Sequence, residues 1–265
     1  MTLTVGGALS ATVPSALPPS AIPQNAAAPS ATVQHYQFGG CDMDLEVNGT
    51  VFQPTLTTRV LAQHAHVPAG ADVLDLGCGV GALAIVAALK GAARVDAVDV
   101  MPQAPPLVEA NARRNRVGDR VWATSGDLFA PVGGRRYDVI ISDVSGVVDE
   151  VSRLSPWYPT TIPTGGHDGA DQIVRMLHDA PHFLRPGGVL YFPTGTISNI
   201  PRTLEAAALS FGPNVELLAQ IEVPFVREFK DNMDVMARLR DEGLISYTTK
   251  RSRHLWTLEI YRAWV

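Results

Sequence analysis

Between Val73 and Lys90 the chain passes from an apolar run through a glycine-rich turn into an alanine-rich segment. Val73-Leu74-Asp75-Leu76 has the length and apolar content of a buried strand. The turn Gly77-Cys78-Gly79-Val80-Gly81 contains three glycines, and glycine permits both a sharp bend and the close approach of a ligand to bare backbone. This order predicts the first strand and helix of a parallel α/β sheet, with a ligand site at the turn.

The same alternation continues toward the C-terminus and predicts parallel strands covered by helices. The expected strands are 95–100, 121–124, 137–141 and 189–192, and the expected helices are around 105–115, 173–183 and 204–211. Two last apolar runs, 215–226 and 255–261, are separated by one helix, which predicts a closing antiparallel pair. The predicted fold class is α/β, a Rossmann-like three-layer sandwich with a mostly parallel seven-stranded sheet and a C-terminal antiparallel strand pair.

The first 33 residues differ in composition from the rest of the chain. They carry no charged side chain, and prolines at 14, 18, 19, 23 and 29 interrupt any helix. We therefore expect a flexible arm at 1–33 and one catalytic domain at 34–265, whose residues 34–70 cover substrate and cofactor. An arm that folds over its own or a neighbouring subunit's active site stays open. A signal peptide is not indicated, because the segment lacks a cationic start and an unbroken apolar stretch.

Charge and cysteine content narrow the classes of partner. The formal net charge of -5 gives no overall attraction to a polyanion, so the charge argues against a nucleic-acid partner. Two cysteines and no cluster of metal-ligand spacing support neither a disulfide framework nor a zinc site, and we expect no metal. No apolar stretch is long enough for a membrane span. The expectation is a cytoplasmic enzyme, with a homodimer left open.

The sign of charge near the glycine turn favours one kind of cofactor. Asp99 ends the second strand 22 residues after Gly77, close to the spacing at which an acid meets ribose hydroxyls. Gly77, Gly79 and Ala82 also satisfy the dinucleotide pattern, so a nicotinamide cofactor is the alternative. Asp75 would repel a pyrophosphate, but it suits a cofactor that carries an ammonium group and a sulfonium cation.

With the pattern Asp-Leu-Gly-Cys-Gly-x-Gly at 75–81, the chain resembles the class I S-adenosylmethionine (SAM) dependent methyltransferases from about Gln37 onward. The resemblance implies that SAM is the cofactor and that Asp99 bonds its ribose. It also implies that Asp127 contacts the adenine amine, with Leu128 beside the ring, although either acid is open to a second interpretation as a strand-end cap. The full set expected to bind the cofactor is Asp75, Gly77, Cys78, Gly79, Asp99, Val100, Gly126, Asp127, Leu128 and Ser142.

Two further segments are similar to the branch that contains the release-factor glutamine and small-subunit ribosomal RNA guanine methyltransferases. Residues 51–58 look like its loop beside the cofactor, and residues 165–169 like the turn that opens a helix after the catalytic strand. That branch carries Asn-Pro-Pro-Tyr after the fourth strand, where this chain has Ser142-Asp143-Val144-Ser145. The Asn and Pro groups hold a planar amine, so their absence removes the main support for amide or exocyclic amine methylation.

Methyl transfer from a sulfonium is an in-line displacement, so positioning alone can supply much of the catalysis. If a base is used, the candidates are Asp143, then His167, then Tyr158, because all follow the fourth strand. Asp143 has an alternative role facing SAM's charged groups or capping a turn. The leading hypothesis is a small-molecule acceptor with an O, N or C nucleophile. The alternatives are a protein or peptide methyltransferase and a non-catalytic SAM-binding partner protein.

Overall fold

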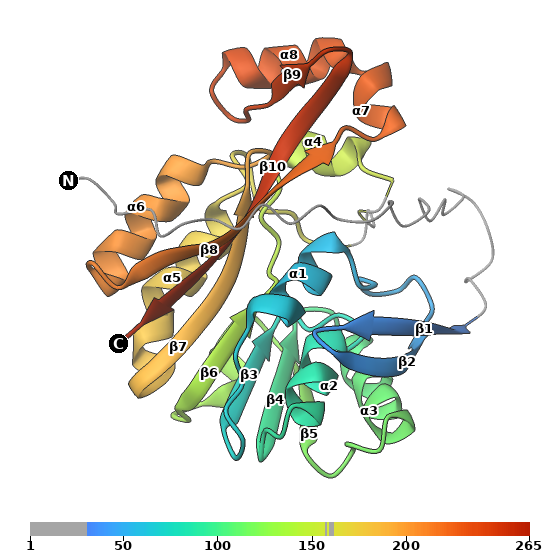
Figure 1. Ribbon diagram of the computed structural model, residues 1–265, viewed down its shortest axis with the longest axis vertical. Helices are drawn as coiled ribbons and strands as arrows, with labels where there is room; N and C mark the ends of the chain where they lie inside the picture. Colours follow the sequence, from blue (N-terminus) through green and yellow to red (C-terminus); the bar gives the residue numbers. More distant parts are fainter. Residues whose placement is uncertain (1–30, 157, 159–161) are drawn as a thin grey trace.

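The computed structural model describes residues 31–156, 158 and 162–265, and these form one large sheet with helices on both faces (Figure 1). The parallel strands are β3 (Asp72–Leu76), β4 (Arg94–Asp99), β5 (Val121–Ser125), β6 (Tyr137–Ser142) and β7 (Leu184–Gly195). The antiparallel strands are β8 (Val215–Pro224), β9 (Thr248–Lys250) and β10 (Arg253–Trp264). The order across the sheet is β5-β4-β3-β6-β7-β10-β8, and β9 pairs with β10.

Helices connect these strands, and those at 82–89, 104–114, 171–183, 200–211 and 233–241 lie where the sequence predicts a helix. They are α1 (Leu56–His64), α2 (Ala82–Leu89), α3 (Ala104–Arg114), α4 (Asp149–Leu154), α5 (Asp171–Phe183), α6 (Ile200–Phe211), α7 (Arg227–Asp231) and α8 (Met233–Asp241), with a short 3-10 turn at Ala130–Val132. The chain leaves β3 for β4 on one side and returns later to β6 on the other. The carboxyl ends of β3 and β6 therefore form a topological switch point, where open α/β sheets bind ligands.

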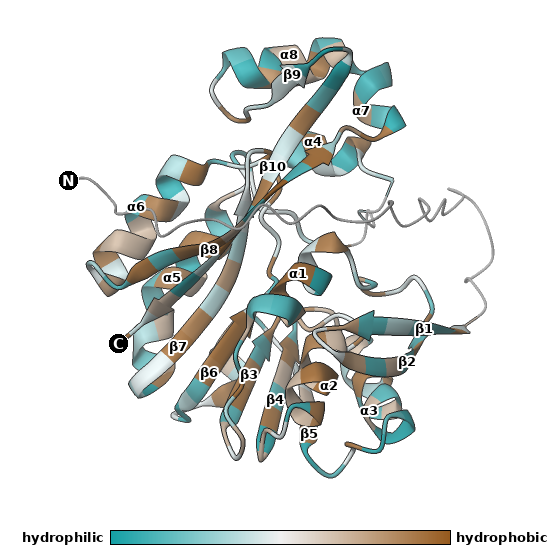
Figure 2. Cartoon of the chain, viewed as in Figure 1, coloured by the Kyte–Doolittle hydropathy of each residue, from teal (hydrophilic) through white to brown (hydrophobic). Residues whose placement is uncertain are grey.

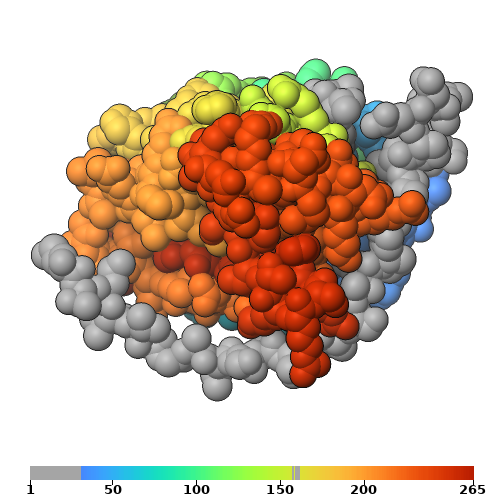
Figure 3. Space-filling model, turned by 90° about the horizontal axis from the view of Figure 1, so that it is seen from above, coloured from blue at the N-terminus to red at the C-terminus, as the bar shows by residue number. Residues whose placement is uncertain are grey.

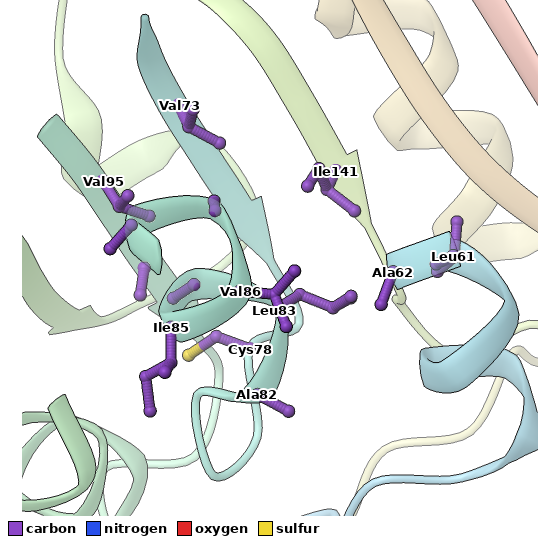
Figure 4. Packing of buried hydrophobic residues seen from close by; sticks show 14 of the residues in the cluster. Leu61, Ala62, Val73, Cys78, Ala82, Leu83, Ile85, Val86, Val95 and Ile141 are labelled. Atoms are coloured by element: carbon purple, nitrogen blue, oxygen red, sulfur yellow. The ribbon is translucent and has the colours of Figure 1, made fainter. Parts of the chain in front are cut away.

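Side chains alternate between the two faces of the sheet, as the two-residue period of a strand requires. Val73, Val95 and Ile141 face α2, whose residues from Ala82 to Ala88 are all buried because α1 covers its outer side (Figure 4). Leu74 and the other inward residues of the opposite face pack against α5 and α6. The brown apolar colour of α2 and of the central strands in Figure 2 follows this burial, which is the main source of stability in such a layered fold.

A third apolar cluster forms a cap beyond the switch-point end of the sheet. It joins Phe225 at the end of β8 to Phe229, Met236 and Leu239 on α7 and α8, and Tyr158 belongs to the same cluster. Figure 3 looks onto this cap, where the orange and red C-terminal segments lie beside the yellow-green segment around residue 150. Met236 and Leu239 are fully buried, so they are core residues.

The predicted fold class is confirmed, including the closing antiparallel pair. Several details differ from the sequence-based prediction, and one is β9, which makes the sheet eight-stranded where seven strands were predicted. An N-terminal hairpin, β1 (Thr32–Phe38) and β2 (Cys41–Val47), was not expected; it is held on α3 by the buried Asn111, whose amide exchanges hydrogen bonds with the Glu46 backbone. Strand β7 begins at Leu184 rather than Val189, because Pro186-Gly187-Gly188 forms an irregularity inside the strand instead of a loop before it.

The domain boundaries remain predictions. Most of the arm expected at 1–33 lies outside the described residues, and β1 begins at Thr32. Residues 34–70 comprise most of the hairpin, the 51–55 loop and α1. Within the described part of the chain, no helix combines the length and apolar character needed to cross a membrane.

Candidate active site

The glycine turn after β3 is packed tightly on both sides by backbone. Gly77 and Gly79 have φ values of +76° and +51°, a region that favours glycine. A Cβ on Gly77 would lie 3.0 Å from the Asp143 carbonyl oxygen, and one on Gly79 would lie 2.5 Å from the Phe52 carbonyl oxygen. These glycines are therefore required by the protein's own backbone, in addition to any ligand that approaches the turn.

Asp75 places a buried carboxylate beneath this turn. Its Oδ2 accepts a 2.8 Å hydrogen bond from the Ala84 amide in the first turn of α2, and its Oδ1 is buried without a partner among the described residues. Burial, with the neighbouring charges of Asp143 and Asp99, raises the pKa of Asp75 to about 8, against the lowering effect of the Ala84 hydrogen bond. A buried carboxylate with a free oxygen fits a cofactor that brings positive charge and N–H donors.

Asp99 connects β4 to the same turn. Its Oδ2 accepts from the Gly79 amide at 2.8 Å, its Oδ1 accepts from the Met101 amide at 2.9 Å, and its pKa is raised by burial. The Gly126 amide donates to the Asp99 carbonyl oxygen at 2.9 Å, so the segment after β5 lies next to the end of β4. The structure thus brings Asp75, the glycine turn, Asp99 and Gly126 to one edge of the sheet.

The other residues expected around the cofactor differ in their surroundings. Ser142 is fully buried beside the turn, Cys78 is buried, and burial raises the pKa of its thiol. Val100 is 48% exposed. Leu128 has a positive φ of 46° and packs on the core, whereas Asp127 is exposed and forms an ion pair with Arg175, Nη2 to Oδ2, at 2.5 Å. The ion pair gives Asp127 a structural partner within the protein, while its predicted contact with adenine stays a prediction.

Asp143 follows β6 directly, and its backbone packs against Gly77 of the glycine turn. Its amide donates to the Leu76 carbonyl oxygen at 2.9 Å, which fixes the end of β6 against the end of β3. Its carboxylate accepts a 2.9 Å hydrogen bond from the hydroxyl of Thr58 in the first turn of α1. Burial raises the pKa of Asp143 to about 6, against the lowering effect of the Thr58 hydrogen bond.

A pocket opens beside the glycine turn and the Asp143 carboxylate, and aromatic rings form part of its wall. Its lining includes the glycine turn, Asp143, Phe52, Tyr158 and Trp256. The rings of Phe52 and Tyr158 meet edge to face with centroids 4.9 Å apart. Gly195 makes room for the third ring, since a Cβ there would lie 2.9 Å from Trp256. No lysine or arginine is among the described residues that line the pocket, so its charge is negative.

The structure places the other two base candidates differently, with Tyr158 in the lining of this pocket and His167 outside it. The Tyr158 hydroxyl bonds to Ser145 Oγ at 2.5 Å and donates to the Pro163 carbonyl oxygen at 2.6 Å, and burial raises its pKa to about 12. Tyr158 thus lines the pocket with its hydroxyl bonded inside the protein, and its role as a base stays a prediction. His167 is exposed and is not among the described residues that line the pocket. It belongs to a turn that packs on residues 146–148. Trp157, proposed with Tyr158 as a lid, lies outside the described residues.

Comparison with known proteins agrees with this site. Residues 49–167 match the family model "Ribosomal protein L11 methyltransferase (PrmA)". The release factor glutamine methyltransferase of Geobacter sulfurreducens is 34% identical over 58% of this chain and 57% of its own length. The ribosomal protein L11 methyltransferase of Methylococcus capsulatus is 41% identical over 50% of this chain and 43% of its own length. This chain therefore spans about half the length of these curated relatives.

A solved structure supports the fold alone, because its sequence identity is low. The ribosomal protein L11 methylase of Lactobacillus delbrueckii superposes with a TM-score of 0.50 at 19% identity, over 80% of this chain and 81% of its own. The fold, the glycine turn at the switch point and the sequence relatives together place this chain among the class I SAM-dependent methyltransferases. Within that class, the relatives named above are methyltransferases of proteins.

These comparisons confirm SAM as the cofactor and correct the expected acceptor. The prediction of a small-molecule acceptor is wrong, because the relatives are named for release factor and ribosomal protein substrates. The argument for a small molecule depended on net charge and on the missing Asn-Pro-Pro-Tyr segment. Neither feature measures the size of the acceptor: overall charge acts at long range, and the missing segment concerns only the atoms beside the methyl group.

Several residues of the site were not selected from the sequence. Phe52, Thr58 and Trp256 reach the pocket from the 51–55 loop, α1 and β10. The similarity of 51–58 to a cofactor-bordering loop indicated the first two in general terms, and the Val80 amide does donate to the Phe52 carbonyl oxygen at 3.2 Å. Nothing in the local sequence around Trp256 indicates the pocket, because it arrives there through strand pairing at the end of the chain.

Proposed function

We propose that this chain transfers the methyl group of SAM to a nitrogen of a protein substrate, with Asp143 as the group that meets the acceptor. The observation that carries the proposal is the pocket between the glycine turn and Asp143, at the switch point of the sheet. The protein substrates in the relatives' names support a macromolecular acceptor. A cytoplasmic location goes with this proposal, because ribosomal proteins function there.

Bound SAM would supply an electrophilic methyl group on a sulfonium, and the chain's residues would do the positioning. Asp75 and Asp99 lie behind the glycine turn, where their negative charge offsets the cofactor's positive charge. Bare backbone at Gly77 and Gly79 lets the cofactor approach closely. Most of the rate acceleration would then come from alignment of the two reacting atoms.

Asp143 favours an amine over an amide as the acceptor. A carboxylate binds an ammonium group, and burial, by raising the pKa of Asp143 to about 6, makes it a stronger proton acceptor than an ordinary aspartate. An amide nitrogen is held instead by neutral carbonyl acceptors, such as those of the Asn-Pro-Pro-Tyr segment that this chain lacks. The apolar rings of Phe52, Tyr158 and Trp256 would enclose the aliphatic part of a lysine side chain and exclude water.

Methyl transfer into separated cell fractions tests the proposal. The protein is incubated with methyl-labelled SAM and a lysate from a strain that lacks this gene, the label is separated by size, and labelled proteins are digested for mass spectrometry. We expect label on lysine or a protein N-terminus. Label confined to small molecules, or absent despite tight SAM binding, would contradict the proposal, and label on glutamine would contradict its amine part.

The matched variants are Asp143→Asn and Asp119→Asn. The first removes the charge at the pocket and should lower kcat about 100-fold while leaving SAM affinity within about threefold. The second changes an aspartate whose side chain is 82% exposed and which is not among the described residues that line the pocket, so kcat and SAM affinity should stay unchanged.

A further inference from the structure

We infer that Thr58 is a positioning residue that fixes the Asp143 carboxylate toward the acceptor pocket. This inference rests on the proposed function, in which Asp143 meets the acceptor. Thr58 is 7% exposed, and its hydroxyl lies 2.9 Å from Asp143 Oδ2, although the two residues are 85 positions apart in the chain. The contact joins the first turn of α1 to the end of β6.

The hydrogen bonds around Thr58 give its hydroxyl a fixed direction. Thr55 and Thr58 form a capping box at the start of α1, in which the Thr55 amide donates to Thr58 Oγ1 at 3.1 Å. A hydroxyl has one proton to donate, and the capping bond uses a lone pair and leaves that proton available. The proton therefore points to Asp143, which orients one carboxylate oxygen and leaves the other, Oδ1, for the acceptor.

The same short segment also contacts the cofactor side. The Phe52 carbonyl oxygen accepts from the Val80 amide at 3.2 Å, and Gly79 lies directly against that carbonyl group. Residues 52–58 thus touch the glycine turn at one end and Asp143 at the other. Thr58 consequently sets the carboxylate relative to the backbone that would hold the methyl donor, which is the alignment that an in-line displacement depends on.

The electrostatic surroundings of Asp143 make this hydrogen bond consequential. The titratable groups near it are Asp75 and Cys78 on the cofactor side and Tyr158 across the pocket, and no lysine or arginine is among the described lining residues. Burial raises the pKa of Asp143, and the Thr58 hydrogen bond lowers it. Loss of the hydroxyl should therefore favour the protonated carboxyl, which neither attracts an ammonium group nor accepts its proton.

The test is a titration of Asp143 in Thr58→Val, Thr58→Ser and Thr55→Ala proteins. Carbon-13 NMR of the aspartate carboxyl groups follows the titration, and Asp143→Asn assigns the signal. In Thr58→Val the midpoint should rise by about one pH unit, because a hydrogen bond to an ionised group is lost. Thr58→Ser should restore the wild-type midpoint. Thr55→Ala weakens the same helix cap and should lower the Tm without moving the midpoint, which separates positioning from a structural role.

Methyl transfer supplies the second readout. The acid limb of the kcat profile should move upward with the carboxyl midpoint in Thr58→Val, and kcat should recover above about pH 8. A folded Thr58→Val protein with a wild-type carboxyl titration would overturn the inference. The titration needs no acceptor, so it decides the role of Thr58 even if the wild type methylates no protein, a result that would overturn the proposed function instead.

Discussion

The two halves of the pocket are built differently. The cofactor half comes from one stretch of chain, β3, the glycine turn and β4, where backbone amides and two aspartates hold one another. The acceptor half is assembled from side chains that arrive separately, with Phe52 before α1, Asp143 after β6 and Trp256 on β10. One half is thus built mainly from backbone, and the other from side chains that the tertiary fold brings together.

This difference predicts how each half responds to mutation. A site built from backbone cannot accommodate an added atom, because that atom collides with main chain that cannot rotate away. A side-chain site loses one contact at a time and keeps its shape. We therefore expect large effects on SAM binding from single atoms in the cofactor half, and selective effects on the acceptor from whole side chains in the other half.

The largest effect is expected for Gly79→Ala. The added Cβ would lie 2.5 Å from the Phe52 carbonyl oxygen, and φ is +51°, so both sterics and backbone strain oppose it. SAM affinity measured by calorimetry should fall about 100-fold or more, with a lower Tm. Gly133→Ala is the matched control, because φ is +59° and no atom lies within 4 Å of its Cβ. Equal SAM affinity in the two variants would break the distinction between the halves.

Asp75→Asn should separate binding from stability. Asparagine keeps an oxygen for the Ala84 amide but removes the negative charge, so SAM affinity should fall about tenfold or more. In wild type without SAM, the pKa of Asp75 is raised from 3.8 to about 8 by burial. Between these values the unfolded chain is ionised and the folded chain is protonated, so stability falls as pH rises.

The stability of Asp75→Asn relative to wild type should therefore increase from pH 4 to pH 8. Urea unfolding at pH 5 and pH 8 without SAM measures this difference. A variant that gains no stability relative to wild type between pH 5 and pH 8 would show that the buried charge is already offset inside the protein, and would weaken the case for a cationic ligand at this carboxylate.

Trp256→Ala tests the acceptor half. Removal of the ring takes away part of the apolar wall and enlarges the pocket. The KM for the protein acceptor should rise about tenfold, with SAM affinity within about twofold of wild type. Trp122→Ala is the control, since this ring is 42% exposed on β5 and contacts Arg94 rather than the pocket. A parallel loss of SAM affinity in Trp256→Ala would show that the two halves are coupled through this ring.

The same contrast explains what the sequence could predict. Apolar patterns along the chain predict β3 to β8 and β10 in order, but not β9. The glycine turn with Asp75 and Asp99 identifies the cofactor half, because the interacting groups are near one another in the chain. Strand order then places Asp143 at the switch point. Thr58 and Trp256 could not be predicted in this way. Thr58 contacts Asp143, which lies 85 positions along the chain, and Trp256 is placed by its strand pairing with Val223.

Mutation of Asp127 is expected to change SAM affinity least, and it tests how far the cofactor half extends. Its ion pair with Arg175 is about half exposed on both sides, so it contributes about 1 kcal/mol or less to stability. If Asp127 contacts the adenine amine, Asp127→Ala should weaken SAM binding about threefold to tenfold, whereas Arg175→Ala should leave it near wild type. Equal, marginal changes in both variants would limit Asp127 to a surface ion pair. The cofactor half would then end at Asp99, with the segment after β5 contributing only its Gly126 hydrogen bond.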